Sequence, residues 1–271
     1  MEQEDLDSWE EFETRVEQFN NDRLEANNGG EGSYSHFLFR GQGDGAWSLE
    51  TTLDRTEIAD WSFSKYFRLI SIAQPQIETF TKQQWDLDEW PKLRDWSSKY
   101  DNLKLSQFPG YEYLVFLRHH GFPSPLLDWT RSPYVAAFFA FVKPHSDRVA
   151  IYVYQEYSGH GKTGSSDLPQ IVSFGPYVRS HSRHFLQQSE YTVAAQFHDG
   201  MWRYEKHESV FSDSSATQDR LWKFTIPRSE REKVLRILDA HNLNSFSLFQ
   251  TEESLLSTIA VRELELREND L

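Results

Sequence analysis

The sequence predicts an α+β fold: a single domain built on a central mixed or antiparallel sheet, with an all-helical insertion. Four short stretches have the apolar character of β-strands, and stretches with helical spacing of apolar residues lie around them. Hydrophobic residues make up 38 % of the 271 residues and aromatic residues 15 %, enough for a sizeable core. Because no internal repeat or low-complexity linker divides the chain, one domain accounts for it.

The chain opens with a predicted helix, a loop and a strand. Ser8 and Glu11 form a capping-box pattern, which starts a helix that runs to about residue 25. Its apolar face consists of Trp9, Phe12, Val16 and Phe19. We interpret residues 1–35 as an N-terminal helix and loop, and residues 36–271 as the α+β domain.

The next segment is predicted to be helical. Residues 55–107 contain scattered aromatic residues in a charged background and lack the alternation of a strand. Residues 111–120 have apolar residues at helical spacing, and Gly121 and Pro123 end that helix. The helical segment therefore covers residues 55–120.

The second half of the chain begins with a buried helix. Ser132 suits its N-cap and Pro133 its first turn, and residues 134–141 are apolar on every side. The predicted strands follow at residues 148–155, 170–174, 189–197 and 220–227. Ser229 with Glu232 opens an amphipathic helix, and Thr251 begins a last helix or strand pair.

Charge and composition limit the classes of function. The formal net charge of −14 repels phosphate backbones, so general nucleic-acid binding is not expected and an anionic ligand must be held by local cations. The absence of cysteine excludes disulfides and thiolate chemistry, and no clustered His and carboxylate pattern predicts a metal. With neither a signal peptide nor a membrane-spanning run in the sequence, we expect a soluble, cytoplasmic protein.

One short stretch, "HFLFRGQGDGAW" at residues 36–47, carries a cation to the end of a strand. Arg40 is followed by Gly41, and a glycine lets backbone approach a ligand closely. The predicted helix start at Ser132 presents free N–H groups beside Asp128 and Trp129, and such a helix end attracts anions. These segments predict an anion site if they meet in the fold.

The same residues carry a family resemblance. "LFRGQ", followed far downstream by "HHGFPSPLLDWTRSPYVAAFFAF" and then "RHFLQQSEYT", resembles the FRG domain family over about residues 36–262. Two positions depart from the family pattern: Arg118 stands in place of a glutamine, and Ser124-Pro125 replaces Thr-Arg. A cationic contact that this change removes would then come from Arg118 or Arg131. The resemblance implies a protein of bacteria and phage-related gene neighbourhoods.

A weaker resemblance suggests a reaction. ADP-ribosyltransferases have an Arg-Gly pair, a Ser/Thr turn and a Gln/Glu-X-Glu motif in this order. The chain offers Arg40-Gly41, then Thr130-Arg131-Ser132, then Gln188-Ser189-Glu190. The resemblance implies an ADP-ribosyltransferase-like fold and NAD⁺ as substrate, without a metal. The products would be ADP-ribosylated macromolecules or free ADP-ribose, made by a toxin or an antiphage effector.

The chemistry of NAD⁺ assigns roles to particular side chains. Loss of neutral nicotinamide develops an oxocarbenium cation, which the Glu190 carboxylate would stabilise, while the Arg40 guanidinium would hold the pyrophosphate. Thr130 and Ser132 would orient the ribose or Glu190. Stacking on nicotinamide falls to Trp129, Tyr191 or Trp47. The other candidate binding residues are Gly41, Gln42, His119, Asp128, Gln187 and Gln188.

Structural roles are the alternative for each of these residues. Arg40 would form an internal salt bridge to Asp128, Ser132 would only cap its helix, and Glu190 would lie on a solvated strand face. The protein would then be a non-catalytic binding module whose arginine pocket recognises a nucleotide, a peptide or a phage component. An enzyme needs Glu190, or a substitute such as Glu205, to face Arg40.

Overall fold

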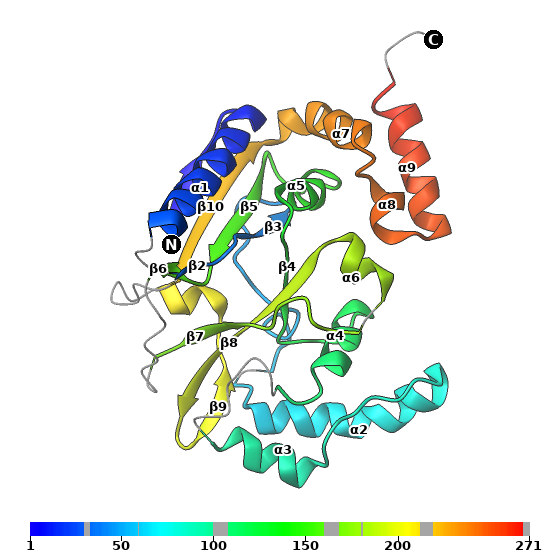
Figure 1. Ribbon diagram of the computed structural model, residues 1–271. Helices are drawn as coiled ribbons and strands as arrows, with labels where there is room; N and C mark the ends of the chain where they lie inside the picture. Colours follow the sequence, from blue (N-terminus) through cyan, green and yellow to red (C-terminus); the bar gives the residue numbers. More distant parts are fainter. Residues whose placement is uncertain are drawn as a thin grey trace.

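We analysed a computed structural model of the chain, which describes residues 1–29, 33–58, 60–99, 108–159, 168–179, 181–211 and 219–267. Its centre is an eight-stranded sheet in the order β1-β10-β5-β3-β4-β8-β7, with β9 paired to β8 (Figure 1). Only the β1–β10 pair is parallel among these strands, so the sheet is mixed and the predicted α+β class is confirmed.

Within the described residues, the strands confirm five predictions and add five short strands. β5 (Arg148–Gln155), β7 (Gln170–Ser173), β8 (Ser189–His198) and β10 (Arg220–Pro227) lie where apolar runs predicted them. The strand that carries Arg40 is β3 (Leu38–Gln42). Sheet strands without a sequence prediction are β1 (Glu2–Asp5), β4 (Leu127–Thr130) and β9 (Met201–Tyr204). β2 (Ser33–Tyr34) and β6 (Ser158–Gly159) form a separate small pair.

The helices of the first half follow the predicted order. They are α1 (Trp9–Gly29), α2 (Phe63–Thr81), α3 (Trp90–Ser97), α4 (Tyr111–His119) and α5 (Pro133–Phe141). The segment predicted to be helical holds α2, α3 and α4, and its residues 59 and 100–107 lie outside the described residues.

The described residues of the second half add four helices and two 3₁₀ turns. The helices are α6 (Ser182–Leu186), α7 (Arg231–Ala240), α8 (Ser245–Phe249) and α9 (Glu252–Leu264). The 3₁₀ turns span His207–Phe211 and Arg228–Glu230. Thr251 caps α9, so the last element is a helix rather than a strand pair. None of the helices in the described part of the chain combines the length and apolar character needed to cross a membrane.

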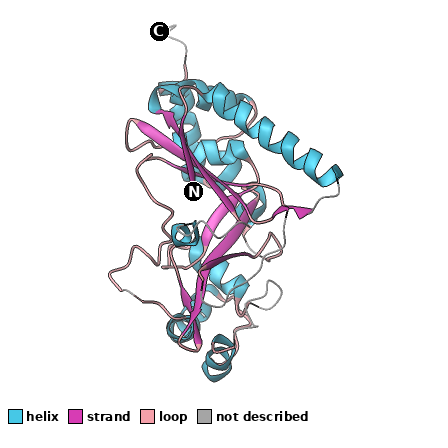
Figure 2. Ribbon diagram, turned by 90° about the vertical axis from the view of Figure 1, so that its left-hand side faces the viewer, coloured by secondary structure: helices cyan, strands magenta, loops and turns pink. Residues whose placement is uncertain are grey.

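The sheet divides where β3 meets β4. These strands share a single residue pair, Phe39 with Thr130, and then diverge. The upper half in Figure 1 (β1, β10, β5, β3) packs against α1, α5 and α7, and the lower half (β4, β8, β7, β9) lies next to α2, α3 and α4. In the view turned by 90° (Figure 2), the strands run along the length of the molecule, with helices at both ends.

Three buried clusters fill the molecule. The first lies between the upper half-sheet and α1, α5 and α7, and the second between the lower half-sheet and α2, α3 and α4. The third lies on the opposite face and contains Trp129, Tyr152 and Tyr154. Trp9 and Phe12 of α1 are fully buried in the first cluster, so the N-terminal helix shares the core of the sheet.

Candidate functional site

Phe39 and Gly41 face α5, and Arg40 between them faces the other way, because side chains alternate along β3. Phe39 is buried in the cluster beneath α5. A Cβ on Gly41 would lie 1.8 Å from the carbonyl oxygen of Ala136 in α5, so only glycine lets this helix pack so closely on the strand. Gly41 also lines a cavity described below, but its tightest constraint is helix packing rather than a ligand.

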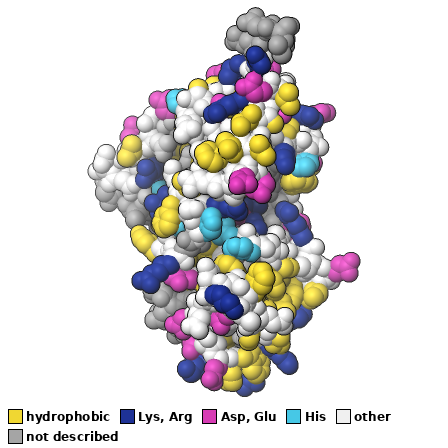
Figure 3. Space-filling model, turned by 90° about the vertical axis from the view of Figure 1, so that its right-hand side faces the viewer, with side chains coloured by type: hydrophobic (Ala, Val, Ile, Leu, Met, Phe, Trp, Pro, Cys, Tyr) yellow, Lys and Arg dark blue, Asp and Glu magenta, His cyan; other side chains and the backbone are white. Residues whose placement is uncertain are grey.

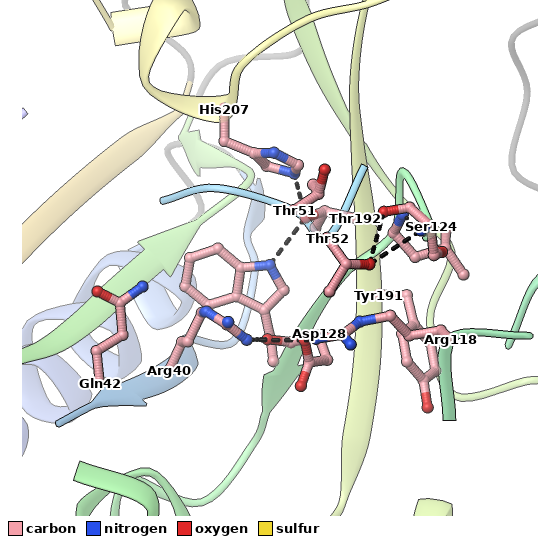
Figure 4. Close-up of polar contacts among 12 residues, drawn as sticks. Arg40, Gln42, Thr51, Thr52, Arg118, Ser124, Asp128, Tyr191, Thr192 and His207 are labelled. Atoms are coloured by element: carbon pink, nitrogen blue, oxygen red, sulfur yellow. Dashed lines mark hydrogen bonds and ion pairs between the residues drawn. The ribbon is translucent and has the colours of Figure 1, made fainter. Parts of the chain in front are cut away.

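Arg40 reaches Asp128 on the neighbouring strand β4. Its Nη1 donates to the Asp128 carboxylate and to the Asp128 carbonyl oxygen, both at 2.8 Å (Figure 4). Arg118 of α4 donates to the same carboxylate at 2.6 Å. The ion pair that the sequence offered as an alternative for Arg40 therefore exists, and Arg118 supplies a second cation.

The electrostatics of this triad follow from one anion between two cations. Burial alone would raise the pKa of Asp128, but the charges of Arg118 and Arg40 outweigh it and hold that pKa well below its usual value. Burial lowers the pKa of Arg40, although the Asp128 charge opposes the shift. One carboxylate thus offsets only one of the two guanidinium charges.

A cavity of about 290 Å³ adjoins Arg40 where β3 and β4 diverge. The predicted site residues that line it are Arg40, Gly41, Gln42, Trp47, Asp128, Trp129, Thr130 and Gln187. Three further lining residues are cations or histidine that the sequence analysis missed: Arg55, Lys143 and His145. The cavity touches Lys143, which follows the C-terminal end of α5, and does not reach Ser132 at the N-terminal end.

The cavity carries an excess of positive charge. Arg55 and Lys143 are exposed, and neither forms an ion pair with any of the described residues. Both hydrogen bonds of Arg40 use Nη1, so Nη2 has no partner within the described ranges. The carboxylate that lines the cavity, Asp128, is shared with Arg118.

An aromatic pair forms the rim. The Trp47 side chain is 41 % exposed, and its ring lies 5.1 Å from the ring of His145. Its backbone is fixed from below, because Tyr152 Oη and Lys223 Nζ donate to the Trp47 carbonyl oxygen at 2.7 and 3.0 Å. An exposed ring on an anchored backbone is suited to stacking on a ligand.

Glu190 lies away from the cavity. Its carboxylate is 3 % exposed and pairs with Arg131 and, at 3.0 Å, with His36. Burial would raise the pKa of Glu190, but the hydrogen bonds and charges of His36 and Arg131 outweigh it and lower that pKa. β4 lies between β3 and β8, and no ion pair joins Glu190 to Arg40 in the described part of the chain.

The other predicted residues near Glu190 hold the backbone. Thr130 Oγ1 donates to the Gln187 carbonyl at 2.6 Å, and Ser132 Oγ accepts from Val135 as the N-cap of α5. Gln188 adopts a positive φ of 49°, and its carbonyl accepts from Arg131 N at 3.1 Å. Neither Ser132 nor Gln188 lines the cavity.

Trp129 lies on one side of β4, and Tyr191 and His119 lie on the other. Trp129 is buried beside the cavity, and its Nε1 donates to Thr192 Oγ1 at 2.8 Å. Tyr191 is fully buried on the other side, where its hydroxyl lies 2.6 Å from His119 Nε2. His119 lines a separate groove, so these two residues do not belong to the Arg40 cavity. Among the described residues, no three His, Asp or Glu side chains gather as metal ligands would.

The fold and this site define a class: an α+β protein with a cationic cavity between the halves of one mixed sheet. Residues 35–148 match the model of the FRG domain, a stretch that contains Arg40, Arg118 and Asp128. The chain therefore contains an FRG domain within this stretch. No curated protein and no solved structure matches the chain.

Proposed function

We propose that the cavity beside Arg40 binds a nucleotide, with NAD⁺ as the candidate ligand. The observation that carries the proposal is the local charge. Arg40, Arg55 and Lys143 face one cavity whose single lining carboxylate among the described residues, Asp128, is shared with Arg118. In a chain of net charge −14, such a gathering of cations stabilises a bound anion.

The shape of the site favours a nucleotide among anions. The free Nη2 of Arg40 with Arg55 and Lys143 would hold phosphate oxygens, and the Trp47–His145 rim would stack on a base. The cavity of about 290 Å³ is at the lower end of the range of about 300–1,000 Å³ usual for small-molecule sites. It therefore suits one nucleotide moiety, and the rest of a dinucleotide would extend past the rim.

Binding can be tested by isothermal titration calorimetry with NAD⁺, AMP and inorganic phosphate. Wild-type protein should bind NAD⁺ and AMP, and Arg55→Ala should weaken both at least tenfold because it removes a phosphate contact. Arg220→Ala is the matched control, since this exposed cation lies on β10 outside the cavity. No binding by wild-type protein, or equal losses in both variants, would overturn the proposal.

Cleavage of NAD⁺ is the second candidate function, either ADP-ribosyl transfer to a macromolecule or hydrolysis. It is supported by one observation: Ser189, the neighbour of Glu190, lines the cavity, and Arg131, which covers Glu190, is 42 % exposed. If Arg131 moved outward, Glu190 would become the carboxylate that stabilises the ribosyl cation. Water or an acceptor group would bond to the anomeric carbon, lose its proton to solvent, and displace neutral nicotinamide.

Nicotinamide release from NAD⁺ separates the two candidates. The enzyme hypothesis predicts turnover by wild-type protein, alone or with bacterial or phage lysate as acceptor, and loss of turnover in Glu190→Gln. Glu232→Gln is the control, because Glu232 is an exposed carboxylate of α7 and neither it nor its sequence neighbours line the cavity. If wild-type protein binds NAD⁺ without releasing nicotinamide under any of these conditions, the protein is a binding module. A toxin or antiphage role would appear as NAD⁺ depletion in cells that express it.

A further inference from the structure

A second hollow of about 680 Å³ lies beside His119, on the other side of β4 from the Arg40 cavity. Its lining comes from α4, α6, the residues before α6 and the loop after α2. We call it the His119 groove. The elements that line it are to the right in Figure 1, the side that faces the viewer in Figure 3, where histidine side chains gather at mid-height.

A buried chain of hydrogen bonds fixes the protonation of His119. His184 Nε2 lies 3.0 Å from the Pro176 carbonyl, which can only accept, so His184 carries its proton on Nε2 and its Nδ1 is an acceptor. That Nδ1 lies 3.3 Å from the Tyr191 hydroxyl, which donates to it. The Tyr191 oxygen therefore accepts from His119 Nε2 at 2.6 Å.

The consequence of this chain is an acceptor nitrogen on a residue that lines the groove. With its proton on Nε2, neutral His119 presents an unprotonated Nδ1, which has no partner among the described residues. Burial lowers the pKa of His119 to about 4, which keeps the ring neutral at pH 7. An N–H donor of a ligand is the natural partner of this nitrogen.

The two walls of the groove are tied together. Tyr111 Oη donates to the Gly175 carbonyl at 3.0 Å, and the Arg179 backbone N–H donates to Glu112 Oε1 at 3.3 Å. With the His119 chain, these bonds connect α4 to the loop before α6 at three points. The groove is therefore preorganised, and a ligand would not have to order it.

The surface of the groove is aromatic, and its charged side chains apart from histidine are Arg179 and Glu112. Trp85 and Phe116 lie 4.4 Å apart between ring centroids, and Phe185 is 66 % exposed. Arg179 is exposed and forms no ion pair with any side chain in the described ranges. Tyr177, two residues earlier, is 88 % exposed. Exposed aromatic residues beside an unpaired arginine are typical of protein-binding surfaces.

We propose that the His119 groove binds a short peptide segment that carries acidic and aromatic side chains. An acidic side chain would pair with Arg179, an aromatic one would pack among Trp85, Phe116 and Phe185, and a peptide N–H would donate to His119 Nδ1. This site is independent of the nucleotide proposed for the Arg40 cavity. It gives the protein a place to hold a protein partner.

The test uses a fluorescein-labelled random copolymer of glutamate and tyrosine, followed by fluorescence anisotropy. Wild-type protein should bind it at least tenfold more tightly than polyglutamate. Arg179→Glu should weaken binding of the copolymer at least tenfold, and Arg220→Glu, the same charge change outside the groove, should leave it unchanged. Phe185→Ser should remove the preference for the copolymer over polyglutamate.

His119→Gln tests the acceptor itself, because glutamine keeps an N–H near the position of Nε2 and lacks Nδ1. It should weaken copolymer binding about tenfold, and the thermal midpoint of each variant shows whether it still folds. Three results would overturn the proposal: no binding by wild-type protein, equal losses in Arg179→Glu and Arg220→Glu, or competition by a single-stranded oligonucleotide at the same site.

Discussion

Asp128 and Glu190 are two carboxylates on adjacent strands, and each contacts two basic side chains. Asp128 pairs with Arg40 and Arg118, and its side chain remains 43 % exposed, beside a cavity. Glu190 pairs with Arg131 and His36, and its side chain is 3 % exposed and outside that cavity. Both carboxylates have two partners, so the number of partners does not explain the difference between them. What makes Asp128 accessible to a ligand is the cavity next to it.

The largest expected effect is on stability, and it concerns β3, the strand whose Arg40 pairs with Asp128. Gly41→Ala places a Cβ 1.8 Å from the Ala136 carbonyl oxygen. The strand and α5 must then separate, so we expect a loss of about 3 kcal/mol or more in the free energy of unfolding, measured in urea. Gly29→Ala is the control, because no heavy atom lies within 4 Å of the position its Cβ would take. Equal losses in the two variants would remove the special role of Gly41.

The next prediction compares the carboxylates directly. Asp128→Asn leaves Arg40 and Arg118 without an anion, and because they are only 13 % and 20 % exposed we expect a loss of about 2 to 3 kcal/mol. Glu190→Gln should cost about 1 kcal/mol, since its partners can turn to water. Urea unfolding of both variants at pH 7 measures the difference. A larger loss in Glu190→Gln would reverse the comparison.

The pH dependence of stability separates the contribution of these carboxylates from that of the buried histidines. Burial lowers the pKa of His119 to about 4 and that of His207 to about 3, so the unfolded chain binds more protons and stability falls as the pH drops from 6.5 toward 4. The lowered carboxylate pKa values of Asp128 and Glu190 add a further loss only below about pH 4.

His207→Gln separates these two windows. It should remove about 1 to 2 kcal/mol of the loss between pH 6.5 and 3 and leave the loss below pH 3, which belongs to the carboxylates, unchanged. Urea titrations at each pH provide the measurement. An unchanged slope above pH 4 would mean that His207 is already protonated in the folded protein.

The smallest expected effect concerns Ser132, at the start of α5. Ser132→Ala removes the N-cap bond to Val135 and should cost about 1 kcal/mol of stability. Because Ser132 does not line the cavity, the affinity for NAD⁺ measured by calorimetry should not change. A loss of affinity beyond twofold would place the helix start in the site.

The fold was predictable where local sequence determines it. Residues 148–155 and 220–227 are apolar runs, and both are strands that lie next to each other. β1 (Glu2–Asp5) has a polar sequence without a strand signal, because its conformation comes from pairing with Trp222 and its neighbours far along the chain. β4 is four residues long, too short for a period to appear.

Part of the site was predictable because local sequence motifs indicate it. The motif around Arg40 and the one around Asp128 indicated two segments that meet, and the structure joins them through an ion pair. Arg55 and Lys143 were missed because no local pattern distinguishes them from other surface cations. β4 lies between the strands that carry Arg40 and Glu190. The order of strands in a sheet cannot be predicted from the spacing of residues along the chain.

The match to the FRG domain ends at Arg148, the first residue of β5. The matched stretch thus contains β3 and β4 but not β8, and only the first residue of β5, although β5 and β8 flank that pair of strands. A recombinant fragment cut at those limits would leave both outer edges of the pair open to self-association. Anyone who expresses this domain should therefore start from all 271 residues and treat the matched stretch as part of a larger folding unit.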